Sequence, residues 1–308
     1  MRASALGQRL GRHPELTVFV GALALAFSGI LFRLSHTSPS TGAFFRCLFA
    51  LPPLLLVARF EERRWGGRTL RQRSYAWGAG LFFAADLIFW HRAIDFVGAG
   101  LATVLSNTQV VLVGLFAWLV WRERPQRSTL IVLPVLVIGI VLVSGVLERG
   151  AYGSNPGKGT VYGILTGLAY TGFLLILREG QRGVVGPAGP LFDATLSSAV
   201  ACLVAGLALG DLDLTPSMSA VGWLVALALV AQVFGWLLVA VSLARLPAMV
   251  TSVSLMFQPV CAVLFAGLIL GEAPSGLQLL GAAAILGGIV VSALGRRGAA
   301  IPEPEPAG

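Results

Sequence analysis

The sequence predicts an all-α integral membrane protein with ten transmembrane helices, arranged as two inverted five-helix repeats. Composition is the first observation. The 308 residues are 56% hydrophobic and 12% charged, whereas a soluble domain averages about 25% charged residues. The second observation is a series of ten apolar runs separated by short linkers. The third is a long segment of the second half that repeats a segment of the first half without a gap.

Each apolar run is close to the length that crosses a membrane as a helix, since about 20 residues span a hydrocarbon core of about 30 Å. The first run could be mistaken for a cleaved signal peptide, because Arg9 and Arg12 precede it and Ala24-Leu25-Ala26 imitates a cleavage site. It is too long for such a signal, and further apolar runs follow it, so we interpret it as the first transmembrane helix. The ten predicted helices cover residues 16–34, 42–60, 75–93, 99–121, 130–147, 159–177, 191–209, 220–243, 248–270 and 277–294.

The distribution of arginine predicts the orientation. The longest linker, at residues 59–74, holds Arg59, Arg63, Arg64, Arg68, Arg71 and Arg73. Most of the 22 Lys and Arg residues fall on the side of the membrane that holds both termini, and loops rich in Lys and Arg are cytoplasmic. We therefore expect a multi-pass protein of the cell membrane, the inner membrane of a bacterium, with cytoplasmic N- and C-termini. The Pro- and Glu-rich tail at residues 296–308 is expected to be disordered.

Charge, cysteines and motifs exclude several classes of function. The net charge of +8 lies in short linkers, where it is an orientation signal, so no nucleic-acid partner is expected. Cys47, Cys202 and Cys261 lie inside apolar runs without metal-ligand spacing, and we expect no metal and no cofactor. The sequence lacks the Gly-x-x-x-x-Gly-Lys-Ser/Thr pattern, so ATP is not expected to drive the protein directly.

The internal repeat predicts a transporter. Several residues recur at the same spacing in both halves, pairing Ala99 with Ala248, Gln109 with Gln258, Glu123 with Glu272 and Pro125 with Pro274. We expect the first repeat at residues 1–150 and the second at residues 151–295. Because each repeat holds an odd number of helices, the two have opposite orientations in the membrane. Inverted repeats are typical of secondary transporters, whose substrate site lies near the bilayer midplane between the halves.

The second copy of the repeat also resembles a known family. Residues 255–274, LMFQPVCAVLFAGLILGEAP, are followed by Gln278, Gly281 and Gly287-Gly288. This segment resembles the C-terminal signature of the EamA family within the drug/metabolite transporter superfamily. The resemblance implies export of amino acids, other metabolites or drugs, and one branch exports aromatic and hydrophobic amino acids. The first copy departs from the pattern, because Val110 follows Gln109 where the second copy has a proline.

The third predicted helix carries the deepest acid. Residues three and four apart share a helix face, which places Phe83, Asp86 and Trp90 on one broad face. A charged group at this depth usually faces a cavity or a partner. Asp86 is predicted to bind a substrate ammonium or a proton, with the two aromatic side chains stacked on the substrate. The alternative is a carboxyl group paired with Arg33 or Arg46.

The repeated glutamines predict the centre of the cavity. Gln109 and Gln258 lie near the middle of their helices and offer hydrogen bonds without charge. The other predicted lining residues are Ser106, Asn107, Gln232, Trp236 and Ser254. Such a cavity would suit an amino-acid backbone and an apolar side chain. The alternative is interhelical hydrogen bonding between the halves, worth about 0.6 kcal/mol per contact.

Three further residues have expected structural roles. Pro259 removes a backbone hydrogen bond, so a hinge is a candidate role and a tolerated kink is the alternative. Glu123 and Glu272 end the repeated helices on opposite sides of the membrane. We expect them to pair with arginine or to accept backbone hydrogen bonds from the helix that follows each of them.

Together these observations predict a secondary transporter that exports aromatic or hydrophobic amino acids, or related small metabolites, by alternating access. Its expected partners are a small-molecule substrate and membrane lipid. Proton coupling is left open, and so is the choice between a monomer and a homodimer. A passive facilitator, or an exporter of drugs or other metabolites on the same scaffold, is the alternative. A membrane enzyme would need a cluster of catalytic groups, and the apolar runs hold few ionisable residues.

Overall fold

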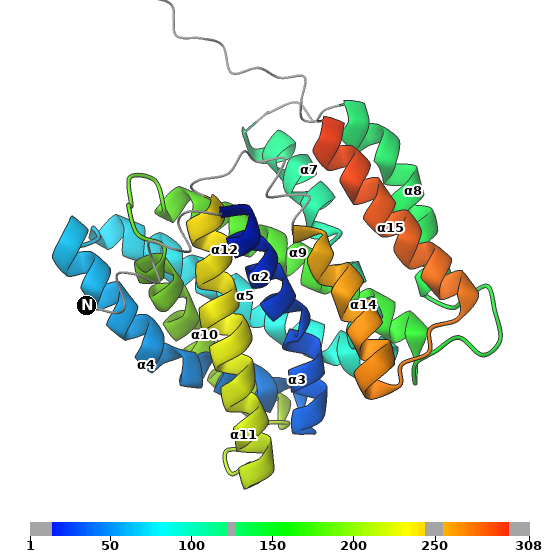
Figure 1. Cartoon of the computed structure of the whole chain (residues 1–308), viewed down its shortest axis with the longest axis horizontal. Coiled ribbons are helices and arrows are strands. Elements are labelled where there is room, and N and C mark those ends of the chain that lie inside the picture. The colour runs from blue at the N-terminus through cyan, green and yellow to red at the C-terminus, as the bar shows by residue number, and fades with distance from the viewer. Residues whose placement is uncertain (1–13, 122–126, 244–254, 296–308) are drawn as a thin grey trace, which may run out of the picture.

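The computed structural model describes residues 14–121, 127–243 and 255–295. Within these residues, every regular element is a helix (Figure 1). The first half contains α2 (Pro14–Ala26), α3 (Ser28–Ser35), α4 (Pro39–Trp65), α5 (Leu70–Val97), α6 (Ala99–Ser106), α7 (Gln109–Trp121) and α8 (Arg127–Val143). The second half contains α9 (Pro156–Gly180), α10 (Ala188–Leu209), α11 (Met218–Leu227), the π-helix η1 (Ala228–Gly235), α12 (Trp236–Leu243), α14 (Phe257–Leu270) and α15 (Gly276–Gly295).

These elements form ten spans, because several of them continue one another. The pairs α2 with α3 and α6 with α7 each make one interrupted span, and α11, η1 and α12 make another. Five described spans are long and apolar enough to cross a membrane, and four shorter helices are apolar. The remaining span, α5, has 28 residues and carries Asp86. The predicted all-α fold with two inverted five-helix repeats is therefore confirmed.

Local sequence explains where the helices begin. Ser38 accepts a hydrogen bond from the Thr41 amide at the start of α4, and Pro39 follows as the first helical residue. Thr69 and Gln72 form a capping box that starts α5. Both helices extend beyond the predicted apolar runs, so the linker expected at residues 59–74 is reduced to residues 66–69. The reason is that charged residues continue a helix past the hydrocarbon core, where hydropathy no longer marks it.

Helices of the two halves pair in a symmetric pattern. The third span of the first half, α5, packs on the first span of the second half, α9. In the same way, the first span of the first half, α2 with α3, packs on the third span of the second half, α11 to α12. Three further contacts join a span to its own counterpart, as α4 packs on α10, α6 on α14 and α8 on α15. Figure 1 shows α8 and α15 side by side at one edge of the bundle. This pairing is what a two-fold axis between inverted repeats requires.

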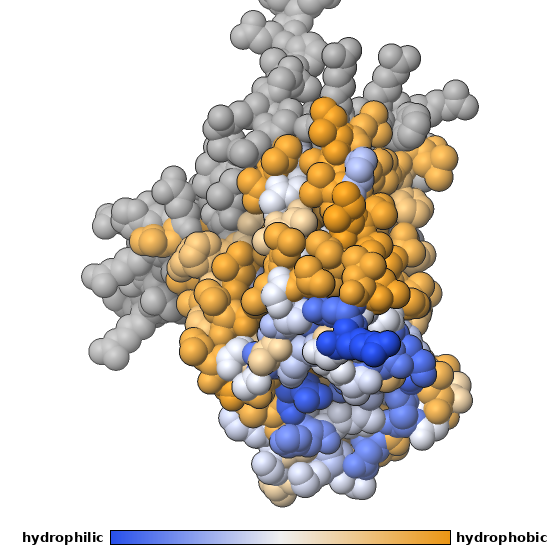
Figure 2. Space-filling model, turned by 90° about the vertical axis from the view of Figure 1, so that its right-hand side faces the viewer, coloured by the Kyte–Doolittle hydropathy of each residue, from blue (hydrophilic) through white to orange (hydrophobic). Residues whose placement is uncertain are grey.

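The outer surface of the bundle is suited to lipid. Large apolar side chains are exposed on it, including Leu268 at 82% and Ile131 at 71%. The face formed by α8 and α15 is largely apolar and gives way to a hydrophilic cap at one end (Figure 2). We call this the glutamate end. It holds residues 36–38, 98, 144–155, 210–217 and 271–275. The opposite end, called the arginine end, holds the connections at residues 66–69 and 181–187.

Candidate functional site

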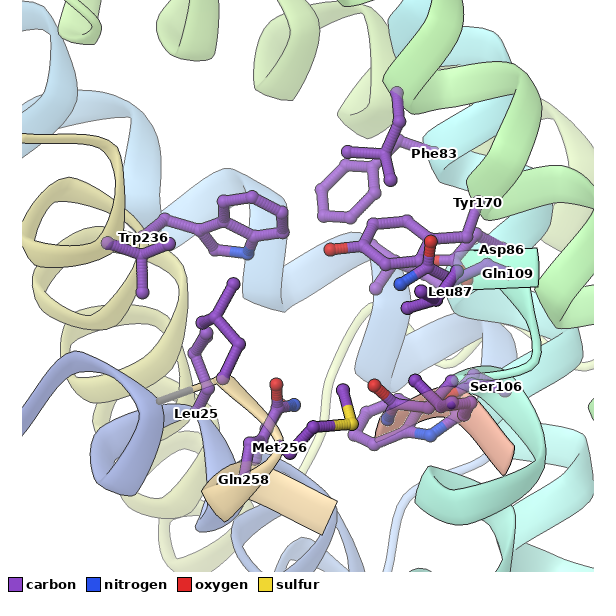
Figure 3. A pocket seen from close by; sticks show the side chains of 18 of the residues that line it. Leu25, Phe83, Asp86, Leu87, Ser106, Gln109, Tyr170, Trp236, Met256 and Gln258 are labelled. Carbon is purple, nitrogen blue, oxygen red and sulfur yellow. The ribbon is translucent and has the colours of Figure 1, made fainter. Parts of the chain in front are cut away.

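A cavity of about 300 Å³ lies in the interior between the two halves. Its wall takes residues from α2 to α7 of the first half and from α9, α12, α14 and α15 of the second half. Figure 3 shows side chains from these elements turned toward one space. Eight of the predicted lining residues line it, namely Phe83, Asp86, Trp90, Ser106, Asn107, Gln109, Trp236 and Gln258.

One side of the cavity is an aromatic cluster. The Phe83 and Trp236 rings meet edge to face with centroids 6.3 Å apart, and the Tyr170 and Trp236 rings do so at 6.1 Å. Phe173, which is fully buried, stacks on Phe83 at 4.7 Å and fixes that ring from behind. Phe83, Tyr170 and Trp236 are seen around the upper part of the cavity in Figure 3. Such a set of rigid rings offers a large apolar contact area to a substrate side chain.

The opposite side is built at two helix breaks. The α6–α7 span is interrupted at Asn107 and Thr108, and α14 begins immediately after a turn at Met256. Asn107 and Met256 occupy equivalent positions in the repeat, two residues before Gln109 and Gln258 respectively. Broken helices at the midplane are a recurrent feature of transporter binding sites, because they bring polar backbone and side chains to the cavity.

Local hydrogen bonds explain how the α6–α7 break is tolerated in a membrane. Asn107 Nδ2 and Ser106 Oγ both donate to the Thr103 carbonyl, at 2.8 and 2.9 Å. Thr108 Oγ1 donates to the Leu105 carbonyl at 2.7 Å. These side-chain bonds add to backbone bonds that persist at the break, since the Asn107 amide donates to the Thr103 carbonyl at 3.3 Å and the Thr108 amide to the Leu105 carbonyl at 3.1 Å. The glutamine after each break is free to extend into the cavity, as Gln109 and Gln258 do in Figure 3.

The cavity also holds two opposite charges. Asp86 on α5 and Arg46 on α4 both line it, and they are 7% and 4% exposed. Asp86 makes no ion pair or hydrogen bond with any described residue, so its predicted pairing with Arg33 or Arg46 is not observed. Arg33 pairs instead with Asp95, at 3.7 Å. The Arg46 guanidinium lies 5.8 Å from the centre of the Trp90 ring.

Arg46 is held by residues from both halves. Its Nε donates to Gln232 Oε1 at 2.9 Å, and its Nη1 donates to Ser28 Oγ at 3.0 Å. Gln232 in turn donates to Thr195 Oγ1 at 3.3 Å. This network of buried side chains fixes the guanidinium at the cavity wall.

Gln232 differs from its predicted position. It is fully buried and does not line the cavity, although Trp236 does. The prediction placed both on one face because residues four apart align in an α-helix. Gln232 lies inside the π-helix η1, whose wider turn changes that alignment and directs Gln232 to Arg46.

The predictions for Ser254 and Pro259 are not confirmed by the structure. Ser254 lies outside the described residues. Pro259 is buried in the first turn of α14, where a missing amide hydrogen leaves no helical bond unmade. The helix break lies before it at Met256, and the equivalent break at Asn107 has no proline. A break can therefore form at this position of the repeat without a proline, and the role of Pro259 as a hinge stays a prediction.

The sequence analysis considered Arg46 only as a partner for Asp86 and did not place it in the cavity. Arg46 is the fifth residue of the predicted run at 42–60, a position typical of an interfacial arginine. In the structure, α4 begins at Pro39, which moves Arg46 deeper. A usable signal was present, since Ser28 is also a polar residue inside an apolar run. Tyr170 of α9 also lines the cavity.

Glu272 joins the two halves at the glutamate end. Its Oε1 accepts a hydrogen bond from the Ala99 amide at 2.7 Å and its Oε2 accepts one from Gly100 at 3.1 Å. The predicted backbone donors are therefore present, but they belong to α6 of the other half and not to the helix that follows Glu272. Gly98 allows this approach, because a Cβ there would lie 2.6 Å from Glu272 Oε2. The equivalent Glu123 lies outside the described residues.

Three comparisons place the chain among known proteins. The sequence model of the EamA-like transporter family matches residues 14–145 and 157–294. Among solved structures, 28 chains match. One is a crystal structure of a protein that is 19% identical, superposes with a TM-score of 0.60 and covers 93% of this chain and 99% of its own. That likeness supports the fold alone. No curated protein matches the sequence.

Proposed function

Because the chain belongs to the EamA-like transporter family, we propose that it exports aromatic and other hydrophobic amino acids by alternating access through its central cavity. The observation that carries the proposal is the composition of the cavity wall. An aromatic cluster, a carboxylate and two symmetric amides surround one space between the inverted repeats. A volume of about 300 Å³ is at the lower limit of ligand pockets and suits a single small solute.

Each part of the wall has a role in this proposal. The substrate side chain packs between Phe83, Tyr170 and Trp236, where the rings exclude water. Asp86 binds the substrate ammonium, which is a stronger interaction in a dry cavity than in water. Gln109 and Gln258 donate and accept hydrogen bonds from opposite sides of the cavity. Rocking of one repeat against the other then exposes the same site to each side of the membrane in turn.

The proposed orientation assigns one end of the bundle to each side of the membrane. The arginine end, which carries residues 66–69 and most of the linker arginines, is cytoplasmic in a bacterial inner membrane. The glutamate end faces the periplasm. In this orientation, the contacts of Glu272 with Ala99 and Gly100 close the periplasmic side of the cavity.

A proton gradient is a candidate driving force for this transport. One observation favours it, namely that the Asp86 carboxylate faces the cavity without a hydrogen-bond partner among the described residues. A carboxylate in this setting can exchange its substrate cation for a proton. An imposed proton gradient should then drive accumulation of phenylalanine in proteoliposomes. Equilibration that ignores the gradient would indicate a passive facilitator.

The proposal is tested by exchange of radiolabelled phenylalanine in proteoliposomes. Trp90→Ala and Gln258→Ala should each lower the exchange rate about tenfold or more, because each removes a contact made inside the cavity. Leu268→Ala is the matched control, since that side chain is 82% exposed on the outer surface. It should leave the rate unchanged. Absence of exchange for every amino acid by the wild-type protein would overturn the proposal, and so would wild-type rates in both cavity variants.

A further inference from the structure

Arg46 is a charged side chain that its protein contacts only partly satisfy. Its Nε and Nη1 are bonded to Gln232 and Ser28. Its Nη2 makes no hydrogen bond with any described residue, and the side chain lines the cavity. A guanidinium keeps its charge in any protein environment and carries five donors. Burying one is costly unless it is paired, so the open side of Arg46 indicates a partner that enters the cavity.

Asp86 does not supply that partner in this structure. The two side chains line the same cavity, but they do not come within ion-pair distance of each other. The cavity therefore presents one cation and one anion, each with free hydrogen-bonding capacity. Two separated opposite charges are complementary to a molecule that carries both charges itself.

We propose that Arg46 binds the carboxylate of the substrate, so that the cavity selects zwitterions over amines and over acids. This inference rests on the proposed function and names the part of the substrate that transport requires. The carboxylate accepts a charge-assisted hydrogen bond from Arg46 Nη2, while the ammonium lies toward Asp86. The guanidinium is presented by Ser28 of the first half and Gln232 of the second half. Binding therefore engages a group that both halves hold.

A purely structural Arg46 is the competing explanation. In that case the guanidinium only joins Ser28 to Gln232 across the halves, and its loss would weaken binding of every substrate alike. The two roles differ in their dependence on substrate chemistry. Only a carboxylate-binding arginine makes the effect of a substitution depend on whether the substrate carries a carboxylate.

Competition with phenylalanine exchange in proteoliposomes separates the two roles. The probes are phenethylamine, which lacks the carboxylate, and 3-phenylpropionate, which lacks the ammonium. In the wild-type protein, unlabelled phenylalanine should compete about 10–100-fold better than either probe, since each lacks one charged hydrogen bond. Equal competition by phenethylamine and phenylalanine would overturn the inference without any variant.

The variants give the second readout. Arg46→Gln should weaken phenylalanine about 10–100-fold and leave phenethylamine competition unchanged. Asp86→Asn should do the reverse, weakening phenethylamine while sparing 3-phenylpropionate. Equal losses for all three compounds in Arg46→Gln would overturn carboxylate binding and leave a structural role.

The inference and the proposed function can fail separately. Wild-type exchange of phenylalanine with unchanged affinity in Arg46→Gln would overturn the inference and retain the function. Absence of exchange by the wild-type protein would overturn the function. In that case thermal-shift measurements with phenylalanine, phenethylamine and 3-phenylpropionate in detergent decide the inference. Stabilisation by phenylalanine that exceeds the stabilisation by phenethylamine supports it, and equal or no stabilisation overturns it.

Discussion

The two ends of the bundle are held together in different ways. At the arginine end, the described polar contacts join α4, α5, α9 and α10 to one another. Arg68 forms a short ion pair with Asp193, and Glu61 accepts hydrogen bonds from the Ala188 and Gly189 amides. Among the described helices, the α5–α9 contact is the most extensive and the α4–α10 contact follows it. We therefore expect α4, α5, α9 and α10 to move as one rigid group.

At the glutamate end, some contacts connect that group to α3 and to the connection before α11, and another contact joins two helices outside the group. Arg33 of α3 pairs with Asp95 of α5. Thr41 of α4 accepts a hydrogen bond at 2.8 Å from the Asp213 amide in the connection to α11. Glu272 joins the end of α14 to the start of α6.

The difference predicts which contacts change in the proposed transport cycle. Alternating access requires one end of the cavity to open while the other is closed. We expect the glutamate end to be the end that opens and closes, since its contacts cross between groups of helices. We expect those contacts to break in each cycle, whereas the contacts of the arginine end within the four-helix group persist.

The largest expected effect comes from locking the glutamate end. Arg33→Cys with Asp95→Cys, joined by a bifunctional thiol reagent, should stop phenylalanine exchange, because α3 can no longer separate from α5. The native cysteines Cys47, Cys202 and Cys261 are buried and should not react. Cleavage of the link by a reductant should restore exchange.

A matched pair at the arginine end serves as the control. Glu62 and Arg73 are bonded at 3.1 Å and belong to α4 and α5 of the rigid group. Cysteines linked at these two positions should leave exchange intact. Inhibition by this pair, or full exchange with the glutamate end linked, would contradict the comparison.

The next largest effect is a loss of stability at the arginine end. The Arg68 and Asp193 side chains are 6% and 4% exposed, and Arg68 Nε has no partner among the described residues. Asp193→Ala removes the more buried of the two carboxylates that Arg68 contacts, while Glu62 stays bonded at 2.9 Å, and we expect a cost of about 3 kcal/mol. Thermal unfolding in detergent measures it. Arg73→Ala removes a more exposed partner of Glu62 and should lower the stability far less than Asp193→Ala. Equal losses of stability in the two variants would argue against a special role of the buried pair in holding the four helices together.

Removing Glu272 should have a moderate effect on stability. Glu272→Ala leaves the Ala99 and Gly100 amides at the start of α6 without an acceptor, which costs about 1–3 kcal/mol. Glu272→Gln keeps a carbonyl oxygen as acceptor and should cost less. Melting temperatures of the two variants test this order, and an alanine variant as stable as the wild type would show that the cap does not hold the end closed.

Glu272 also predicts a pH dependence of the closed end. Burial raises the pKa of this carboxyl group above its ordinary value of 4.5, while the Ala99 and Gly100 amides and Arg33 lower it by less. The closed state therefore binds the proton more tightly than an exposed carboxyl group does. Stability should rise as the pH falls from 7 toward 4.5 and should be lost as the pH rises through the raised pKa. A melting profile from pH 5 to 8 checks this, and Glu272→Gln should remove that part of the slope.

The fold was predictable because hydropathy and charge act over whole segments. Runs of apolar residues and the repeat of Gln109 and Gln258 determine the spans and their inverted arrangement. The same pattern predicted Asp86 and the aromatic residues of α5 in the cavity, because one helix face can be worked out from spacing alone.

The remaining features depend on contacts that spacing does not contain. Gln232 was misplaced because a π-helix has no hydropathy signature and changes which residues share a face. Arg46 was missed because its depth depends on where α4 begins and on its partners Ser28 and Gln232, which lie far apart in the sequence. The partners of Glu272 were assigned to the wrong helix, since its contact with α6 arises only when the halves pack together.

The smallest expected effect comes from the same pair whose locking should have the largest. Arg33 and Asp95 are 42% and 40% exposed and 3.7 Å apart, and an exposed ion pair contributes about 0–1 kcal/mol. Arg33→Ala should therefore change the melting temperature little and leave phenylalanine exchange near the wild-type rate. Measured together, the two experiments separate the strength of this contact from its position. A severe loss of stability in Arg33→Ala would mean that the pair itself holds the glutamate end closed. Near-normal stability, together with inhibition by the cysteine link, would mean that α3 and α5 must move apart at a place where little energy opposes them.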